Sequence, residues 1–372
     1  MVFWHPRGLG VVRALEDAAR RRTAAEGYLE VRTPQLVRRP IWEASGHWEH
    51  FRAGMFTVAD AGEAAALKPV SCPCHIQIAG RSGLSYRDLP LRLCEFGLCH
   101  RDEPSGTLHG LFRLRQFTQD DGHVFCADEH ILPEIAQFCR GAGEFYRALG
   151  FVSVAVALST RPPQRAGDDA QWDRAEALLA AGARLAGLEP TLQPGEGAFY
   201  GPKLEFSLED RHGRRWQCAT IQLDFVLPQR FDLAYVDADG RRRRPAMLHR
   251  ALYGSVERFL AILLEHAGGV LPPWLAPVQV QVAPVGPDQH NAAHAALREL
   301  RAAGLRAALD ERRETLGKRV AGAHADGIPC LAVLGPREQD AGTLALRERG
   351  GHSSLPRAEA VADLARRYAP PV

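Results

Sequence analysis

The segment from Cys99 to His123 combines side chains that bind phosphate with side chains that bind a small polar substrate or a metal. Its first part supplies the cations His100, Arg101, His109, Arg113 and Arg115. Its last part ends with the polar residues Gln119, Asp120, Asp121 and His123. Arginine donates paired hydrogen bonds to phosphate oxygens, and Asp and His can hold an amine, a hydroxyl group or a metal. We therefore expect a polyphosphate and a small polar ligand to bind side by side here.

The sequence contains no glycine-rich nucleotide loop of the GxxxxGK[ST] or GxGxxG type after an expected strand. A nucleotide would then be held by arginine side chains on a sheet, and the candidates are Arg101, Arg113 and Arg258. Arg258 stands at the expected start of a helix, where unpaired backbone N–H groups favour an anion. Each of these arginines, taken singly, is also compatible with a solvated surface cation.

The composition is typical of a globular protein with two or three domains: 372 residues, 46% of them apolar and 24% charged. The net charge of +2 gives little global attraction to a nucleic acid, so such a partner would have to meet local patches. No apolar run approaches the roughly 20 residues of a membrane span, and the N-terminus does not resemble a signal peptide. We expect a cytoplasmic protein whose eight cysteines are reduced.

Lysine is rare in this chain, because only Lys68, Lys203 and Lys318 occur among 46 basic residues. A coding bias that replaces lysine by arginine would spare lysine where a compact ammonium group is required. Lys68 and Lys203 are therefore candidates for such places. Accidental survival explains any single lysine about equally well.

The order of the expected elements changes near residue 270. Before it, helices are expected at 8–26, 129–149, 168–186 and 254–266, and strands at 28–31, 91–98, 111–117, 151–158, 203–209 and 215–225. Single helices between antiparallel hairpins favour an α+β fold. After the Pro-rich linker 271–277, a regular alternation predicts a compact α/β domain. Its expected strands are 278–285, 305–310, 329–335 and 343–349, and its expected helices are 289–303, 315–325 and 357–368.

Long blocks of the chain resemble the threonyl-tRNA synthetases, a family of class II aminoacyl-tRNA synthetases. The blocks include KPVSCPCH at 68–75, HRDEPSGTLHGL at 100–111, FTQDDGHVFC at 117–126, GEGAFYGPKLEF at 195–206, QCATIQLDF at 217–225 and HRALYGSVERF at 249–259. The resemblance implies a class II catalytic domain at 1–270, with an antiparallel sheet and flanking helices, the linker 271–277, and an anticodon-binding domain at 278–372. It also implies a homodimer formed through the motif 1 region near Pro34.

The activity that the resemblance implies is threonine–tRNA ligation, in which L-threonine and ATP form threonyl-adenylate and the threonyl group passes to the 3′ end of tRNA(Thr). The catalytic residues would be Arg101, His47 and Lys203, with a structural histidine beside Trp48 as the less favoured interpretation of His47. ATP, with Mg²⁺, would be bound by Arg101, Glu103, Arg113, Gln217 and Arg258. Preorganised cations stabilise the charge that develops at the reacting phosphate.

The resemblance further assigns a zinc ion to Cys72, His123 and His249, and threonine to Gln119, Asp121, Tyr200 and Gln222. The residue types alone leave each metal ligand open as a buried cysteine or a core histidine. A zinc ion with one open position would accept both the amine and the hydroxyl group of threonine, and so exclude valine. Glu338 and Arg347 would contact the anticodon bases.

Several positions depart from the family pattern. They are Ser71, Cys74, Gln116, Ala219, Phe231, Arg313 and Ala321. We expect several of them around the amino-acid pocket and the anticodon reader. Ordinary drift would explain them, and so would a divergent duplicate that resists an inhibitor, regulates by binding tRNA, or charges an acceptor other than tRNA.

The amino-acid specificity gives the first prediction. Serine keeps the amine and hydroxyl groups of threonine and lacks one methyl group, which is worth about 1–3 kcal/mol of discrimination. The bacterial relatives carry an N-terminal editing domain, and we expect none in this chain. Purified protein should therefore form seryl-tRNA about 10–200-fold less efficiently than threonyl-tRNA. Charging assays with each amino acid measure this ratio, and the absence of a seryl product at high serine concentration would contradict the expectation.

Overall fold

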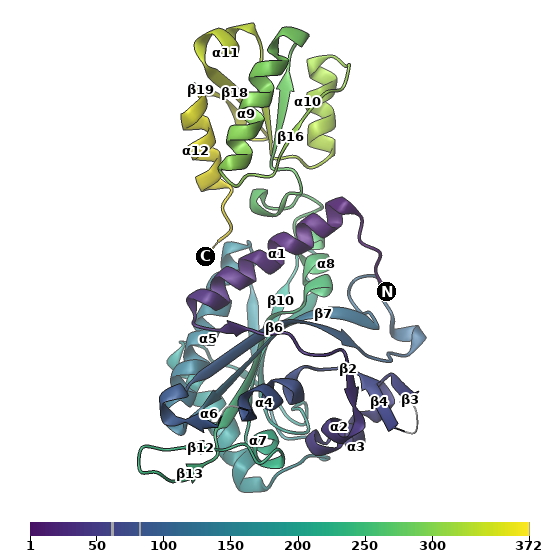
Figure 1. Cartoon of the computed structure of the whole chain (residues 1–372), viewed down its shortest axis with the longest axis vertical. Helices are drawn as coiled ribbons and strands as arrows, with labels where there is room; N and C mark the ends of the chain where they lie inside the picture. Colours follow the sequence, from purple (N-terminus) through teal and green to yellow (C-terminus); the bar gives the residue numbers. More distant parts are fainter. Residues whose placement is uncertain (61–62, 82, 372) are drawn as a thin grey trace. The chain divides into compact units, whose positions relative to one another are not determined.

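The computed structural model describes residues 1–60, 63–81 and 83–371, and these residues form two compact units (Figure 1). The first unit contains Met1–Phe3 and Ala19–His266, and the second contains Trp4–Ala18 and Ala267–Val372. Helix α1 (Pro6–Ala25) therefore supplies residues to both. The sequence-based domain limits, 1–270 and 278–372, remain a prediction. In the described part of the chain, no helix is both long and apolar enough to cross a membrane.

The first unit is built on an eight-stranded sheet. In spatial order the strands are β1 (Leu29–Glu30), β6 (Leu91–His100), β7 (Gln116–Cys126), β14 (Ala246–Ser255), β11 (Arg215–Asp224), β10 (Lys203–Glu209), β8 (Val154–Ser159) and β9 (Thr191–Gln193). The six central strands are antiparallel, and only the short edge strands β1 and β9 pair in parallel with their neighbours. This sheet with flanking helices confirms the expected α+β fold.

Helices cover both faces of this sheet. Helix α5 (Asp128–Ala148) packs on the face that carries Arg92, whose guanidinium group donates to Glu134, and α6 (Asp169–Leu185) packs beside α5. Helix α4 (Cys72–Gly80) lies on the opposite face, against β7. Helix α6 begins with a capping box, because the Asp168 carboxylate accepts the N–H of Gln171 at 2.8 Å and the Gln171 side chain accepts the N–H of Asp168 at 3.3 Å.

Helix α8 (Val256–His266) follows β14 directly, and Gly254 makes the turn between them possible. Its φ of +76° is unfavourable for other residues, and a Cβ atom there would lie 2.9 Å from the carbonyl oxygen of Cys218. The first unit also contains two three-stranded sheets and short helices. These elements are β2 (Leu36–Arg38), α2 (Arg39–Ser45), α3 (His47–His50), β3 (Thr57–Asp60), β4 (Glu63–Leu67), β5 (Leu84–Ser85), α7 (Val226–Arg230), β12 (Tyr235–Val236) and β13 (Arg242–Arg243).

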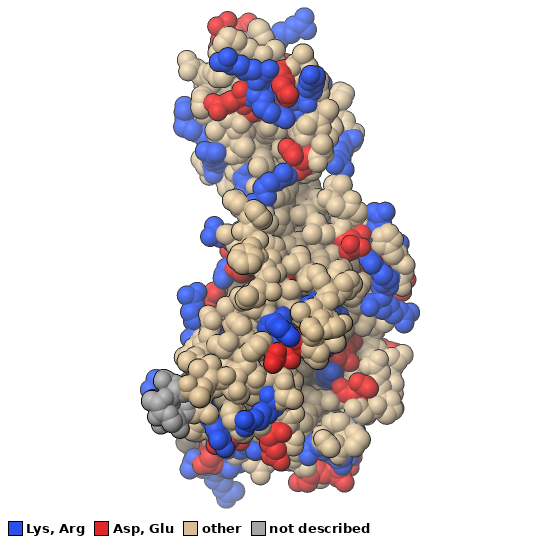
Figure 2. Space-filling view, turned by 90° about the vertical axis from the view of Figure 1, so that its right-hand side faces the viewer, with Lys and Arg blue, Asp and Glu red and all other residues tan. Residues whose placement is uncertain are grey.

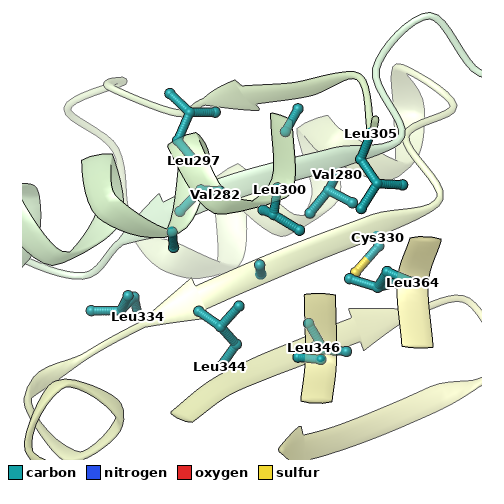
Figure 3. Packing of buried hydrophobic residues seen from close by; sticks show 14 of the residues in the cluster. Val280, Val282, Leu297, Leu300, Leu305, Cys330, Leu334, Leu344, Leu346 and Leu364 are labelled. Carbon is teal, nitrogen blue, oxygen red and sulfur yellow. The ribbon is translucent and has the colours of Figure 1, made fainter. Parts of the chain in front are cut away.

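The second unit is a mixed five-stranded sheet with helices, as the alternation in the sequence predicts. The strands, in spatial order, are β16 (Ala307–Leu309), β15 (Val280–Pro284), β17 (Cys330–Leu334), β18 (Thr343–Glu348) and β19 (Gly351–Pro356). Helices α9 (His290–Ala302) and α12 (Arg357–Arg367) bury Leu297, Leu300 and Leu364 against β15, β17 and β18 (Figure 3). Helices α10 (Leu316–Ala325) and α11 (Pro336–Ala341) complete the unit.

The expectations for individual elements are wrong in two informative places. The expected strand 111–117 is displaced, because β7 begins at Gln116 and runs to Cys126. Its polar run from Gln119 to His123 has low strand propensity and does not read as a strand. Strand β14 was not expected either, since its apolar residues are continuous with those of α8, and the residues Gly254 and Ser255 belong to the strand instead of the helix. Helix α4 and strand β19 were also missed.

The core of the second unit yields a prediction with a matched control. Val282 is fully buried on β15, whereas Val285, just after the same strand, is 50% exposed. Val282→Ala should lower the free energy of unfolding of this unit by about 2 kcal/mol, because it removes buried methyl groups and leaves a cavity. Val285→Ala should change it by less than about 0.5 kcal/mol. Hydrogen exchange of the β15 and β17 amides measures both, and equal effects of the two substitutions would refute this assignment of the core.

Candidate active site and metal centre

The register of the large sheet places the candidate site residues in rows. One row crosses five strands through Leu93, His123, His249, Gln222 and Lys203, each paired with the next. Residues directly opposite one another on antiparallel strands point to the same face and lie about 5 Å apart. Residues separated by as many as 156 positions in the sequence, Leu93 and His249, therefore meet on one face.

A second row lies two residues along the strands and carries the acids. It runs through Glu95, Asp121, Ala251, Thr220 and Glu205. Because the side-chain period of a strand is two, this row faces the same side as His123. Asp121 is 6% exposed, and one of its carboxylate oxygens accepts the N–H of Ser71 at 3.3 Å. Burial raises the pKa of Asp121, and His75 and His249 oppose that shift.

Helix α4 delivers the third metal ligand, Cys72, at its first residue. The Cys72 sulfur and one ring nitrogen each of His123 and His249 lie within 4.8 Å of one another. All three side chains are buried, with exposures of 2%, 1% and 5%. A tetrahedral zinc ion with bonds of about 2.0–2.3 Å would hold such atoms about 3.5 Å apart, so small side-chain movements would close the site. The structure thus brings together the three residues expected to bind zinc.

The hydrogen bonds behind these ligands fit a metal site. Nε2 of His249 lies 2.9 Å from the Asp224 carboxylate, and Nδ1 of His123 lies 2.8 Å from Nδ1 of His75. Each imidazole thus has one nitrogen engaged and the other available, which is the usual arrangement of metal-binding histidines. Asp224 is fully buried and also accepts the N–H groups of Val226 and Leu227. The three donor residues and the hydrogen bonds that orient the two histidines therefore fit a zinc ion.

Burial shifts the pKa values of two of the candidate metal donors, Cys72 and His123. Burial raises the pKa of the Cys72 thiol well above its usual value, and the nearby carboxylates of Asp121 and Asp224 raise it further. Burial lowers the pKa of His123 well below its usual value, and His75 and His249 add to this effect. A divalent cation would offset the first effect, since it stabilises a thiolate directly.

The expected threonine-binding residues surround this group. The Tyr200 hydroxyl donates to the Gln222 side chain at 2.8 Å, and the Tyr200 ring stacks on His249 with centroids 4.9 Å apart. The side-chain oxygen of Gln119 is buried and accepts no hydrogen bond, and the buried hydroxyl of Ser71 has no partner either. Buried polar atoms without partners are rare and suit a site that a polar ligand completes.

Some of the expected ATP-binding side chains form ion pairs with each other, and others donate hydrogen bonds to backbone carbonyl groups. Arg113 donates through Nε and one terminal nitrogen to the same Glu103 oxygen, at 3.0 and 2.7 Å. Nε of Arg101 donates to the carbonyl oxygen of Pro69 at 3.2 Å, and its guanidinium group lies 5.0 Å from the centre of the Phe117 ring. Two residues, Glu103 and Arg113, therefore already form an ion pair.

Arg258 is held by two backbone carbonyls, those of Gln217 at 3.3 Å and Phe112 at 3.1 Å. Its guanidinium group also lies 5.6 Å from the Trp216 ring, which stacks on Phe112 with centroids 4.4 Å apart. The Gln217 side chain is exposed and donates to Glu205. Lys203, expected to face a carboxylate or phosphate, forms an ion pair with Glu205 at 2.7 Å. An aromatic pair next to Arg258 was not anticipated from the sequence.

His47 lies in the same unit and is 3% exposed. Its Nδ1 lies 2.8 Å from the Ser45 hydroxyl, and its ring contacts those of Phe199 and Tyr200 at centroid distances of 5.2 and 6.2 Å. Burial lowers its pKa to about 3, with His249 and Arg101 adding to the effect. The ring is thus neutral near pH 7 and close to Tyr200, at the edge of the expected threonine pocket.

Two buried acids connect β7 to its surroundings: Asp120, which the sequence analysis grouped with the site residues, joins β7 to β14, and Glu257, which it did not mention, joins β7 to α8. The Asp120 carboxylate accepts the N–H groups of Leu252, Tyr253 and Gly254 at 2.7–3.0 Å, and burial raises its pKa to about 6. The Glu257 carboxylate accepts the N–H of Thr118 at 2.9 Å. The only signal in the sequence was Asp120 next to Asp121. An acidic pair on one strand must point to opposite faces, so one of the two acids had to face away from the pocket.

Comparison with known proteins identifies the family. Residues 56–267 match the family described as "tRNA synthetase class II core domain (G, H, P, S and T)", and residues 279–367 match the family described as "Anticodon binding domain". A crystal structure described as the RNA binding domain of threonyl-tRNA synthetase from Cryptosporidium parvum Iowa II is 36% identical, with a TM-score of 0.96. The alignment covers 100% of this chain and 93% of that chain. The chain belongs to the threonyl-tRNA synthetase family.

Curated relatives named threonine–tRNA ligase are also similar to this synthetase-family chain. The protein of Caulobacter vibrioides (strain NA1000 / CB15N) is 53% identical over 94% of this chain and 54% of its own length. The protein of Gluconacetobacter diazotrophicus is 50% identical over 100% of this chain and 58% of its own length. The chain thus spans a little over half the length of these relatives. A prolyl-tRNA synthetase of Giardia lamblia, 19% identical with a TM-score of 0.71, shares the fold.

The positions that depart from the family pattern lie in different parts of the fold. Phe231 packs against the apolar cluster that contains Cys72 and Leu227, close to the metal centre. Ala219, in contrast, is fully buried, and its backbone bonds to the Tyr146 hydroxyl of α5 on the other side of the sheet. In the second unit, Arg313 and Ala321 are exposed.

The residues expected to contact the anticodon lie on neighbouring elements, Glu338 on α11 and Arg347 on β18. The Glu338 carboxylate accepts the N–H of Gly335 at 2.9 Å and so caps its own helix. Arg347 is half-buried. On the face shown in Figure 2, basic and acidic side chains occur together, which agrees with the nearly neutral net charge.

The pKa of His47 gives a prediction for stability. Its folded value of about 3 lies below the usual unfolded value of about 6.5. The stabilisation is therefore fully present above pH 6.5, and it is lost as the pH falls toward 3, because only the unfolded chain takes up the proton. Lowering the pH from 7.5 to 5 should cost about 2 kcal/mol through this residue.

The variant His47→Gln should lack this part of the pH dependence. Urea unfolding at pH 7.5 and pH 5 measures the difference. His212→Gln is the control, since His212 is exposed and should leave the pH dependence unchanged. An identical loss of stability in wild type and His47→Gln would disprove the lowered pKa.

Proposed function

We propose that this chain carries the aminoacylation activity of a threonine–tRNA ligase. It would activate L-threonine with ATP to form threonyl-adenylate and transfer the threonyl group to the 3′ end of tRNA(Thr). The observation that carries the proposal is the buried group of Cys72, His123 and His249, which shares one sheet face with Asp121. Membership of the threonyl-tRNA synthetase family supports it.

In the first step, a threonine carboxylate oxygen would attack the α-phosphorus of ATP and pyrophosphate would leave. We assign the terminal guanidinium nitrogens of Arg101 to the α-phosphate, because its Nε is occupied by the carbonyl oxygen of Pro69. Arg258 is oriented by two backbone carbonyls and suits the γ-phosphate. Glu103 and Arg113, paired at 2.7 Å, would bind the adenine and phosphate ends of the nucleotide, and Gln217 its remaining edge. Fixed charges of this kind stabilise the transition state of phosphoryl transfer, for which Mg²⁺ would accompany ATP.

Selection of threonine would depend on polar groups at the floor of the pocket. Zn²⁺ held by Cys72, His123 and His249 would supply a Lewis-acid position for the amine and the hydroxyl group of the amino acid. Asp121 would accept hydrogen bonds from these groups, and Gln119, Tyr200 and Gln222 would line the rest of the pocket. A site with this many buried polar atoms rejects valine, which would leave them unpaired.

In the second step, the 3′-terminal hydroxyl group of the tRNA would attack the adenylate carbonyl. His47 would accept a hydrogen bond from that hydroxyl group through Nε2, since its Nδ1 is oriented by Ser45. Its low pKa keeps the ring neutral and able to accept. Lys203, paired with Glu205, would neutralise the phosphate as it leaves.

We further propose that the second unit binds the anticodon through Glu338 and Arg347, and that the protein is a cytoplasmic homodimer. The segment around Pro34 is the proposed dimer surface, because Leu29 and Leu36 on either side of it are 60% and 50% exposed. All eight cysteines are buried and unpaired, as suits a reducing compartment.

Threonine-dependent ATP–pyrophosphate exchange, followed by tRNA charging, tests the proposed activity. Exchange with threonine but not valine, together with threonyl-tRNA formation, is the expected result. Exchange without tRNA charging would instead indicate another acceptor. A chain that binds tRNA without any exchange would be a regulator, and either outcome would overturn the proposal.

The metal centre gives a sharper prediction. Cys72→Ser should abolish stoichiometric zinc binding and reduce threonine-dependent exchange by more than about 100-fold, because it removes one of three ligands. The matched control is Cys74→Ser, a buried thiol on the same helix that is not one of the three donors. Metal analysis by mass spectrometry and the exchange assay give both readouts. Equal zinc content in the two variants would contradict the site.

A further inference from the structure

A run of buried polar side chains extends from His123 to Lys68, and the proposed mechanism uses only its first member, His123. Nδ1 of His123 lies 2.8 Å from Nδ1 of His75, and Nε2 of His75 lies 3.2 Å from the Glu95 carboxylate. The ammonium group of Lys68 lies 2.8 Å from the same carboxylate. These four side chains are at most 5% exposed, and His75 and Lys68 are fully buried.

The Glu95 carboxylate occupies the centre of this run and receives four hydrogen bonds. One oxygen accepts from the Lys68 ammonium at 2.8 Å and from the Thr33 N–H at 3.0 Å. The other accepts from the Thr33 hydroxyl at 2.8 Å and from the His75 ring. Lys68 also donates to the Thr33 hydroxyl, whose own proton must therefore point at Glu95. An ionised carboxylate offers about four acceptor positions, so Glu95 is saturated.

Glu95 remains ionised in this environment. Burial by itself would raise its pKa, but the hydrogen bonds from His75 and Lys68 prevail and lower the pKa to about 2. An ionised carboxylate accepts hydrogen bonds and cannot donate them. The direction of every hydrogen bond in the run is therefore set at Glu95.

This direction determines which nitrogen of His123 is free. Because Glu95 only accepts, Nε2 of His75 must carry a proton, and a neutral His75 ring then has its lone pair on Nδ1. That lone pair accepts the Nδ1–H of His123, since the two atoms are 2.8 Å apart. A neutral His123 ring with its proton on Nδ1 has its lone pair on Nε2, the nitrogen that remains for the metal. His249 is fixed more directly and as the other tautomer, because its Nε2–H donates to Asp224 and its lone pair is then on Nδ1.

We propose that Lys68, Glu95 and His75 are positioning residues that fix the tautomer of His123 and thereby set the affinity of the centre for its metal. The proposal rests on the proposed metal site and assigns three residues to it. Supporting hydrogen bonds to metal-binding histidines typically change metal affinity 10–100-fold. The proposal also explains why Lys68 is a lysine, because a planar guanidinium group does not replace a compact ammonium in a fully closed space.

Glu95→Gln is the most informative substitution, because it keeps the shape of the side chain and reverses one end of the run. The Lys68 ammonium and the Thr33 N–H can only donate, so the amide oxygen of the new side chain must face them. Its NH₂ group then faces His75 and donates to Nε2. His75 would in turn donate from Nδ1 to His123, which moves the His123 proton to the nitrogen needed by the metal.

The experiment compares zinc affinity by competition with a chromophoric chelator, using Zn²⁺ alone. We expect zinc to bind about 10–100-fold more weakly to Glu95→Gln than to the wild type. Nitrogen-15 spectra of the metal-free histidines should show the His123 proton on Nδ1 in the wild type and on Nε2 in the variant. Asp210→Asn is the matched control, since Asp210 is a buried carboxylate with several donors, including the Trp216 ring, and contacts no metal ligand.

The outcomes distinguish a failure of the positioning role of Lys68, Glu95 and His75 from a failure of the proposed metal site. If the wild type binds no zinc, the proposed metal centre fails. If the wild type and Glu95→Gln bind zinc equally, or Asp210→Asn weakens zinc as much, the positioning role is wrong. A purely structural role would lower the unfolding temperature of the metal-free protein without changing zinc affinity. Should Glu95→Gln not fold, His75→Phe removes the acceptor of the His123 proton while keeping a ring, and unchanged zinc affinity there would overturn the proposal.

Discussion

The pairing of β7 with β14 is the constraint on which the rest of the site depends. It sets His123 opposite His249, and Asp121 opposite Ala251, on strands separated by more than one hundred residues. A slip of one residue between the two strands would turn one of these histidines to the opposite face of the sheet and separate the pair. The register is held by more than the ladder, because Asp120 accepts three N–H groups of β14 and Glu257 accepts one from β7. Asp120 on the back of β7 and Glu257 on α8 thus help to fix the residues on the front of the sheet.

This arrangement places many polar groups in a closed interior. Such groups cost free energy when buried and remain only where their hydrogen bonds are made. Here the bonds are made by carboxylates behind each imidazole: Asp224 behind His249, and Glu95, through His75, behind His123. Thr33 joins the same network from the segment just before Pro34. The metal centre is therefore anchored in the segment that we propose as the dimer surface.

Much of the fold could be read from the sequence, because its signals are local. Helices α5, α6, α9 and α12 have clear apolar periodicity, and the β10–β11 hairpin is bounded by turn residues, so all were expected within a few positions. Strand β7 was predicted at displaced positions, because its site residues are polar and have low strand propensity. Strand β14 was missed, because its apolar residues are continuous with those of helix α8. The three metal ligands came from the family resemblance alone. Residue spacing could not have found them, because the sheet register that unites them is set by tertiary packing. No role was expected for His75 or Glu95, and Asp120 was grouped with the ligand-binding residues, because these roles depend on which face of the sheet each side chain takes.

The complete burial of Lys68 helps to explain why this arginine-rich chain has kept a lysine at this position. Lys318 is exposed, and Lys203 has one-fifth of its side chain exposed and an acidic neighbour, so at both places an arginine would find room in solvent. Lys68 has no exposed surface, and its two acceptors fit one small cation. Replacement of lysine by arginine has little effect on stability at the protein surface. It is not tolerated where the lysine is enclosed, because the interior has no space for the larger guanidinium group. Of the three remaining lysines, the fully buried Lys68 marks an enclosed cation site, and in other arginine-rich chains a fully buried lysine is a place to look for one.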